Sequence, residues 1–258
     1  MPDLLHERRG DVAWITFNRP EARNALTFAM YEELARICED ANKDETLRVI
    51  VLRGAGEKAF ASGTDINQFR AFKTPQDALD YEGRIDRILT ALEQCRVPTI
   101  AAIAGACTGG GAGIAACCDI RIAARNAKFG FPIARTLGNT LSSASLSRVT
   151  ALIGAARVKD IVFTARLIDA AEAERIGLVT ELLDDLPALE KRAGELAATI
   201  AGNAPLTIRS TKEGLRRLQN RLAREEAQDL IVMCYMSEDF REGMDAFLNK
   251  RPPQWKGR

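Results

Sequence analysis

The fold of this chain is decided by one stretch, Ile103-Ala104-Gly105-Ala106-Cys107-Thr108-Gly109-Gly110-Gly111-Ala112-Gly113-Ile114-Ala115-Ala116-Cys117-Cys118-Asp119-Ile120. Three successive glycines stand there between an apolar strand, predicted over 98–104, and an apolar helix, predicted over 110–117. Glycine has no Cβ, so a ligand can approach its backbone N–H closely. The following helix adds unpaired N–H groups and the positive end of its dipole. This turn is therefore suited to hold an oxyanion or a phosphate.

The same region raises the question of a transmembrane helix, because residues 97–118 carry no charge. The run contains Pro98 and five glycines, and its remaining bulk is mostly alanine. Three consecutive glycines would interrupt a spanning helix. A buried strand, a turn and a buried helix fit this composition better.

A second loop of small residues follows a strand predicted over 48–53 and has the sequence Lys58-Ala59-Phe60-Ala61-Ser62-Gly63-Thr64-Asp65-Ile66. Together the two loops resemble the paired signatures of the crotonase (enoyl-CoA hydratase/isomerase) superfamily, K-A-F-x-x-G-x-D-I and G-x-x-x-G-G-G-x-x-x-A-x-x-C-D-I. Three further segments resemble the same family, namely residues 19–26, 165–173 and 238–251.

This resemblance implies an α/β fold, with a crotonase-like ββα spiral core over residues 1–200 and a C-terminal helical trimerisation region over 201–258. In relatives such a tail mediates trimer formation, so we expect a homotrimer or a homohexamer. The apolar residues of the tail are compatible with trimer contacts, and they equally suit a cover for their own subunit: Leu230, Ile231, Met233, Met236, Phe240 and Phe247.

Local patterns predict the remaining elements. Alternating residues around Gly10 indicate an antiparallel hairpin over 4–8 and 12–18. Thr27 is expected to cap a helix that runs to about residue 43, and Pro75 to open a helix of about 18 residues. A strand is expected over 119–124, and from residue 140 onward the chain is expected to be mainly helical, with 180–183 as its one strand.

Composition excludes several classes of function. The 258 residues are 47% hydrophobic, enough for a sizeable core, and the formal net charge is +1. Acidic and basic residues are interleaved, so no strong field gathers nucleic acid or an anionic membrane, and we expect neither as a partner. The short, charged N-terminus does not resemble a signal peptide, which favours a cytoplasmic location.

The cysteines and the single histidine argue against metal chemistry. Six cysteines show no C-x-x-C pair and no Cys/His spacing suited to zinc, so we expect no metal and reduced, buried thiols. Cys107 lies beside the glycine turn, where a helix dipole could lower its pKa, but a small apolar filler is the favoured interpretation. His6 is the only histidine, which rules out a multi-histidine metal site.

The resemblance implies an acyl-CoA thioester as the substrate, with coenzyme A as part of that substrate and no separate cofactor. A thioester carbonyl becomes negatively charged when the α-carbon is deprotonated, the β-carbon is attacked or a carboxylate is lost. Matched residue by residue, the backbone N–H groups of Thr64 and Gly110 correspond to the family's oxyanion-hole donors. Thr64 replaces the usual alanine. Asp65 and Asp119 are expected to be structural, the first as a helix cap.

The carboxylates used by hydratases of this family are missing. Those enzymes carry one glutamate three residues after the middle glycine and another directly after the proline of an F-G-x-P motif. Gly113 and Ile133 stand at these positions here, and no Asp or Glu occurs between Asp119 and Asp160. Water addition by paired carboxylates therefore lacks its proton carriers.

Polar residues near the missing carboxylates can orient or polarise a substrate but are poor bases at neutral pH; they are Arg135, Asn139, Ser142, Ser143 and Ser145. Other relatives place catalytic groups on the helix after the first loop. That makes three carboxylates alternative proton carriers, each of which also fits a solvated helix face: Asp80, Glu82 and Asp86.

The family's coenzyme A contacts correspond to Arg23, Ala25, Lys58, Ala61 and Gly63, with Phe240 and Lys250 added from the tail. The sequence thus predicts an acyl-CoA lyase or isomerase in which true hydration is disfavoured. Decarboxylation is an alternative, because loss of carbon dioxide needs an oxyanion hole but no base in its first step, and Arg135 could hold the departing carboxylate. A CoA-binding scaffold without turnover is the alternative from a different class.

Overall fold

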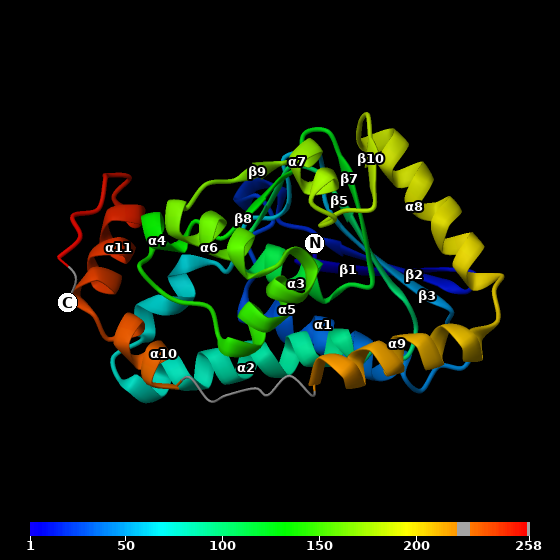
Figure 1. Ribbon diagram of the computed structural model, residues 1–258, viewed down its shortest axis with the longest axis horizontal. Coiled ribbons are helices and arrows are strands. Elements are labelled where there is room, and N and C mark those ends of the chain that lie inside the picture. The colour runs from blue at the N-terminus through cyan, green and yellow to red at the C-terminus, as the bar shows by residue number, and fades with distance from the viewer. Residues whose placement is uncertain (221–227, 257–258) are drawn as a thin grey trace.

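Two β-sheets form the centre of the computed structural model, which describes residues 1–220 and 228–256 (Figure 1). The larger sheet has the order β1-β2-β3-β5-β7-β10, with the bounds Leu4–Arg9, Val12–Phe17, Val49–Gly54, Thr99–Ile103, Ile120–Ala124 and Glu181–Leu183. The smaller sheet has the order β4-β6-β8-β9, with the bounds Ala59–Ala61, Ala106–Thr108, Lys128–Gly130 and Ile168–Asp169.

Helices surround both sheets. The α-helices, in chain order from α1 to α11, are Phe28–Ala41, Pro75–Glu93, Gly110–Cys117, Ile133–Thr136, Ser143–Ile153, Ala155–Thr164, Ala170–Arg175, Leu186–Ala201, Pro205–Asn220, Gln228–Tyr235 and Glu238–Leu248. Two 3-10 helices, η1 and η2, span Pro20–Ala22 and Ile66–Ala71. The expected α/β fold with a helical C-terminal region is confirmed.

The predicted hairpin and helix boundaries are confirmed. β1 and β2 pair antiparallel from Leu4 with Phe17 to Arg9 with Val12, and every further pairing in the larger sheet is parallel. Parallel neighbours require crossover connections, which the helices supply. Thr27 caps α1, and α3 spans the predicted range.

The smaller sheet was not predicted. Its strands have two or three residues each, too short for an alternating pattern to be visible in the sequence. The expectation that 180–183 is the one strand after residue 140 is wrong, because β9 also lies there and pairs antiparallel with β8. Its two residues are stabilised only by that tertiary pairing.

Two apolar layers hold the larger sheet. On one face, side chains such as Trp14 and Val51 pack against Leu189 and Ala193 of α8, which lies alone along that side in Figure 1. The other face packs against α1, α2, α3 and α5 in the main core. Burial on both faces explains why the central parallel strands are continuous apolar runs rather than alternating ones.

The C-terminal helices cross the molecule from the α8 end to the opposite end, where α10 packs against α2 and α11 against α4 (Figure 1). Phe240 is buried and Met236 packs beside it, whereas Met233 and Phe247 are 64% and 53% exposed. The side chains of Leu230 and Ile231 lie outside the described residues. In the part of the chain that the structure describes, no helix meets the length and apolarity needed to cross a bilayer.

Asn24 offers a test of what holds the N-terminal turn. It is fully buried with φ +55°; its amide donates to the carbonyls of Ala55 and Ala59, and its Oδ1 accepts from the Arg19 N–H. Because Asn24→Ala leaves these buried groups unpaired, we expect it to lower the free energy of unfolding by about 2 to 4 kcal/mol. Urea denaturation would measure this loss.

The matched control is Asn18→Ala, which removes one hydrogen bond to the carbonyl of Pro2 near the exposed terminus. It should change the free energy of unfolding by no more than about 0.5 kcal/mol. Equal losses in the two variants would contradict this account of the turn.

Candidate active site

The two glycine-containing loops come together at one edge of the smaller sheet. β4 and β6 pair in parallel, Ala59 with Ala106 and Ala61 with Cys107, so the loops that follow them leave the same edge. The approach is backbone to backbone, because a Cβ on Gly111 would overlap the carbonyl group of Ala61. Only glycine fits there, which gives one of the three successive glycines its physical reason.

Two backbone N–H groups are unpaired where these loops meet. A Cβ on Gly63 would lie 3.9 Å from the nitrogen of Gly110, which places the residue before Thr64 next to the start of α3. Within residues 1–220 and 228–256, neither the Thr64 nor the Gly110 N–H has a hydrogen-bond acceptor. The N–H at the first position of a helix has no intrahelical partner. Both groups are therefore available to a ligand.

The Thr64 side chain links this loop to two helices. Its Oγ1 lies 3.0 Å from the Tyr31 hydroxyl of α1 and 3.0 Å from the Tyr81 hydroxyl of α2. The Tyr31 hydroxyl also fills the space beside Gly110, where any Cβ would overlap it. The hydroxyl of Thr64 thus has local partners and fixes the position of its own backbone.

Glu82 is a buried carboxyl on the α2 turn next to Tyr81. The residue is 6% exposed, and the Tyr235 hydroxyl of α10 donates a hydrogen bond of 2.6 Å to its Oε1. Burial raises the pKa of Glu82 to about 7, while the hydrogen bond from Tyr235 lowers it and the charge of Asp86 raises it further. Glu82 therefore does not lie on a solvated helix face.

Asn139 holds Tyr235 from the other side. Its Nδ2 donates to the Tyr235 hydroxyl over 3.2 Å, so that hydroxyl accepts from Asn139 and donates to Glu82. The Oδ1 of Asn139 is buried and has no hydrogen-bond partner among the described residues. An unpaired buried acceptor is costly, which makes it a candidate for contact with a bound molecule.

The two other candidate carboxylates of α2, Asp86 and Asp80, have hydrogen-bond partners of their own. Asp86 accepts hydrogen bonds from Ser142 over 2.8 Å and from Arg148 over 3.3 Å. Asp80 is exposed and accepts from Gln76. Ser142 also caps α5 through the N–H of Ser145, so it has a structural role.

The positions of the missing glutamates are apolar in the structure. Gly113 is buried on α3, and a Cβ there would lie 3.7 Å from Leu89 of α2. Ile133 begins α4 and is 8% exposed. Arg135 lies on the same short helix and is exposed to solvent.

Asp65 and Asp119 have the expected structural partners. Asp65 caps η2 and pairs with Arg19 at 3.0 Å; burial alone would raise its pKa, but the bonds from Arg19 and Asn67 hold that pKa below its usual value. Asp119 accepts from the backbone N–H of Thr99 and pairs with Lys212. Neither carboxylate is a free base.

The predicted coenzyme A positions fall into two groups. Several surround the first loop: the carbonyl of Arg23 accepts from the Ser62 N–H, Lys58 is exposed and Gly63 is buried. The two tail positions differ in exposure. Phe240 is 1% exposed within an aromatic cluster, whereas Lys250 is exposed to solvent.

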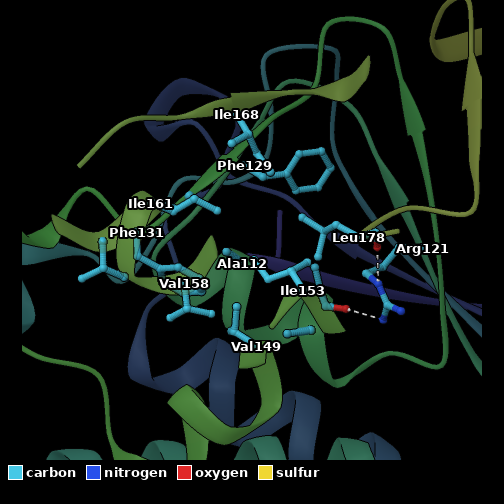
Figure 2. Close-up of a pocket in the computed structure, with 14 residues that line it drawn as sticks. Ala112, Arg121, Phe129, Phe131, Val149, Ile153, Val158, Ile161, Ile168 and Leu178 are labelled. Carbon is cyan, nitrogen blue, oxygen red and sulfur yellow. Dashed lines mark hydrogen bonds between the residues drawn. The ribbon is translucent and has the colours of Figure 1, made fainter. Parts of the chain in front are cut away.

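An apolar cavity of about 30 Å³ is lined by side chains of α3, α5 and α6, among others (Figure 2). Its walls include Ala112, Phe129, Val149 and Ile161, and Arg121 at its rim is held by the carbonyl of Leu178. The volume suits little more than a water-sized occupant, and the lining offers it almost no polar partner. Cys107 is fully buried in the main core, and burial raises the pKa of its thiol, which excludes a low-pKa nucleophile at the glycine turn.

Comparison with known proteins identifies the family. The family described as enoyl-CoA hydratase/isomerase matches residues 7–258. The short-chain-enoyl-CoA hydratase of Clostridium acetobutylicum is 35% identical over 259 residues, covering 96% of this chain and 95% of that protein. The chain belongs to the enoyl-CoA hydratase/isomerase family.

Solved structures of this family share the fold. An enoyl-CoA hydratase/carnithine racemase from Magnetospirillum magneticum has a TM-score of 0.81 at 35% identity, covering 100% of this chain and 97% of that one. Methylmalonyl-CoA decarboxylase in complex with 2-nitronate-propionyl-CoA has a TM-score of 0.90 at 29% identity, covering 100% of this chain and 99% of that one. The crotonase-type fold expected from the two loops is thereby confirmed.

Sequence reasoning missed the three tyrosines around Thr64 and Glu82. Tyr235 lies 153 residues from its partner Glu82, so no local pattern connects them. One signal was present for Glu82 itself, because residue 82 falls on the buried stripe of α2 between Ala78 and Ile85.

The raised pKa of Glu82 predicts a pH-dependent effect on stability. A carboxyl with a folded pKa of about 7 and an ordinary value of 4.5 stabilises the fold fully below pH 4.5, and this contribution is lost as the pH rises through 7. Glu82→Gln does not titrate. We therefore expect its free energy of unfolding, relative to wild type, to increase by about 3 kcal/mol between pH 4.5 and 8.

Denaturant unfolding at several pH values would measure this difference. Asp80→Asn is the control on the same helix, since Asp80 is exposed, and it should change the free energy of unfolding by no more than about 0.5 kcal/mol. A Glu82→Gln difference that does not change with pH would show that Glu82 ionises normally.

Proposed function

We propose that this chain is an enzyme that acts on an acyl-CoA thioester and stabilises an enolate-like oxyanion with the backbone N–H groups of Thr64 and Gly110. The observation that carries this proposal is the pair of unpaired N–H groups on adjacent loops, within a fold shared with acyl-CoA enzymes. Donors of this kind contribute about 3 to 4 kcal/mol each to transition-state stability.

The structure favours donors that do not reorganise. The Thr64 backbone is held by its side-chain contacts with Tyr31 and Tyr81, and a parallel bridge joins Thr64 to Leu26. Gly110 begins α3, so the helix dipole adds to its attraction for negative charge. Rigid, prepositioned donors are what stabilisation of a transient anion requires.

Hydration by paired carboxylates is not the reaction that this site supports. Gly113 and Ile133 leave both proton-carrying positions of the hydratases apolar. Reactions that pass through the enolate with at most one carboxyl group remain, such as a shift of the double bond, which would make the enzyme an isomerase.

Decarboxylation is a second candidate, favoured by the high structural similarity to methylmalonyl-CoA decarboxylase. Loss of carbon dioxide leaves the same enolate and needs no base in its first step. Arg135 is a poor choice to hold the departing carboxylate, because it is exposed on α4.

Coenzyme A itself is proposed to lie along the first loop. Lys58 is exposed there and can meet a phosphate, while Arg23, Ala25, Ala61 and Gly63 shape the backbone around it. Lys250, exposed after α11, is a further candidate for a phosphate contact.

A binding experiment and a substrate panel test the proposal. Titration calorimetry should show binding of butyryl-CoA, with Lys58→Ala weakening it several-fold and the exposed Lys43→Ala as the matched control. Mass analysis of reactions with crotonyl-, 3-enoyl-, malonyl- and methylmalonyl-CoA should then show conversion of one of the last three. Absence of CoA-thioester binding at millimolar concentration would refute the acyl-CoA proposal, and binding without any turnover would favour a scaffold.

We also propose a homotrimer, or a homohexamer of two trimers. Exposed apolar side chains of the tail support this assembly, since Leu206, Leu215 and Met233 are 75%, 58% and 64% exposed. Light scattering at micromolar concentration should give three or six times the 28.2 kDa mass of one chain. A monomeric mass would contradict the assembly.

Restoring the two carboxylates should restore hydration. We expect slow hydration of crotonyl-CoA by wild type and an increase of about a hundred- to ten-thousand-fold in the Gly113→Glu, Ile133→Glu double variant. A Cβ at residue 113 has only an ordinary contact with Leu89, so a Cβ atom fits at this position. Absorbance loss of the enoyl thioester measures the rate.

The control is the double variant Gly113→Gln, Ile133→Gln, which adds the same volume without a proton carrier and should not hydrate faster. Fast hydration by the wild-type protein would contradict the assignment of an apolar, carboxylate-poor site at these positions.

A further inference from the structure

The site contains one carboxyl group that no cation neutralises. Among the described residues, Glu82 has Tyr235 as its hydrogen-bond partner and no Lys or Arg in an ion pair. The nearby carboxylates differ, because Asp86 pairs with Arg148 and Asp65 pairs with Arg19. A buried carboxyl whose hydrogen-bond partner is neutral can gain and lose a proton.

Glu82 is linked to both unpaired N–H groups through its neighbours. The hydroxyl of Tyr235 donates to Glu82, and the Tyr235 ring centroid lies 6.1 Å from that of Tyr81. The Tyr81 hydroxyl in turn contacts the Thr64 hydroxyl at 3.0 Å. Tyr31 contacts the same hydroxyl and lies beside Gly110, and the charge of Glu82 contributes to raising the pKa of Tyr31, which burial raises most. The carboxyl therefore belongs to the same cluster as the two donors.

We propose that Glu82 exchanges a proton with the α-carbon of the bound thioester, and that Tyr235 and Asn139 are the residues that position it. This inference rests on the proposed function. The α C–H bond breaks, its electron pair forms the enolate whose oxygen meets the Thr64 and Gly110 N–H groups, and the proton moves to a Glu82 carboxylate oxygen. In the reverse direction protonated Glu82 returns the proton to carbon, so no further reactant is needed.

The unpaired Oδ1 of Asn139 supports a ligand on this side of the cluster. Within the part of the chain that the structure describes, this oxygen is buried without a partner, while the Nδ2 of the same residue donates to the Tyr235 hydroxyl. Tyr235 is 2% exposed and comes from α10, so the C-terminal region completes the site. A purely structural link between α10 and α2 would not require an acceptor left open.

The environment suits proton transfer near neutral pH. Burial favours the neutral carboxyl, the Tyr235 hydrogen bond favours the charged one, and the balance gives a pKa of about 7. The titratable groups around Glu82 are the phenols of Tyr31, Tyr81 and Tyr235 and the carboxylate of Asp86, which Arg148 pairs. An acid or base is most effective when its pKa is close to the working pH.

Exchange of the α-protons of butyryl-CoA in D₂O tests this role without knowledge of the natural acyl group. Wild type should incorporate deuterium at the α-carbon, as measured by mass spectrometry. Glu82→Gln should lower the exchange rate by about a hundredfold or more, because glutamine keeps an acceptor for Tyr235 but its amide neither accepts nor releases a proton near neutral pH. Asp80→Asn should exchange at the wild-type rate.

Tyr235→Phe separates positioning from a structural role. Loss of its hydrogen bond to the charged carboxyl should move the pH midpoint of exchange upward, whereas a structural effect would lower the rate at every pH without moving the midpoint. Folding is checked by thermal melting and butyryl-CoA binding by calorimetry.

The outcomes distinguish this inference from the proposed function. Binding of butyryl-CoA with no exchange in wild type, or with equal exchange in a folded Glu82→Gln, overturns the role of Glu82 and leaves the acyl-CoA proposal standing. A lack of butyryl-CoA binding by wild type overturns both.

Discussion

The site depends on the parallel pairing of two three-residue strands, β4 and β6. This pairing makes the loops after Ala61 and Thr108 leave one sheet edge side by side, which brings the Thr64 and Gly110 N–H groups together. The contact is possible only with a glycine at residue 111, because its backbone packs on Ala61. A small amount of sheet thus positions the whole site, and the larger sheet with its two apolar layers keeps that edge in place.

Buried polar groups stabilise this arrangement from three sides. The Asn24 amide donates to the carbonyl of Ala59. The Thr64 hydroxyl contacts the hydroxyls of two tyrosines, and the Tyr235 hydroxyl is hydrogen-bonded to both Glu82 and Asn139. Each group is costly to bury without a partner, so the set fixes one arrangement of α1, α2 and α10 around the loops. Among the described residues, the exception is the Oδ1 of Asn139, which is buried without a hydrogen-bond partner.

The C-terminal helices have two roles in this molecule. Tyr235 and Phe240 bury their rings against Phe69 and α2, so the tail closes the apolar side of the site. Other tail side chains remain exposed on the outer surface and are the basis for the proposed assembly. A tail that both covers the site and contacts other copies would couple the order of the site to oligomerisation.

The sequence by itself determined the family, the two loops, the strands of the larger sheet and the helices α1, α2 and α3, because glycine spacing, caps and apolar periodicity are local properties. It also showed that Gly113 and Ile133 cannot carry protons. Only the tertiary structure decided which partners the α2 carboxylates have, since Asp86 pairs with Arg148 and Glu82 accepts a hydrogen bond from Tyr235, 153 residues away. Burial and partner charge set a carboxyl's pKa, and both arise from contacts between distant segments rather than from neighbours in the chain.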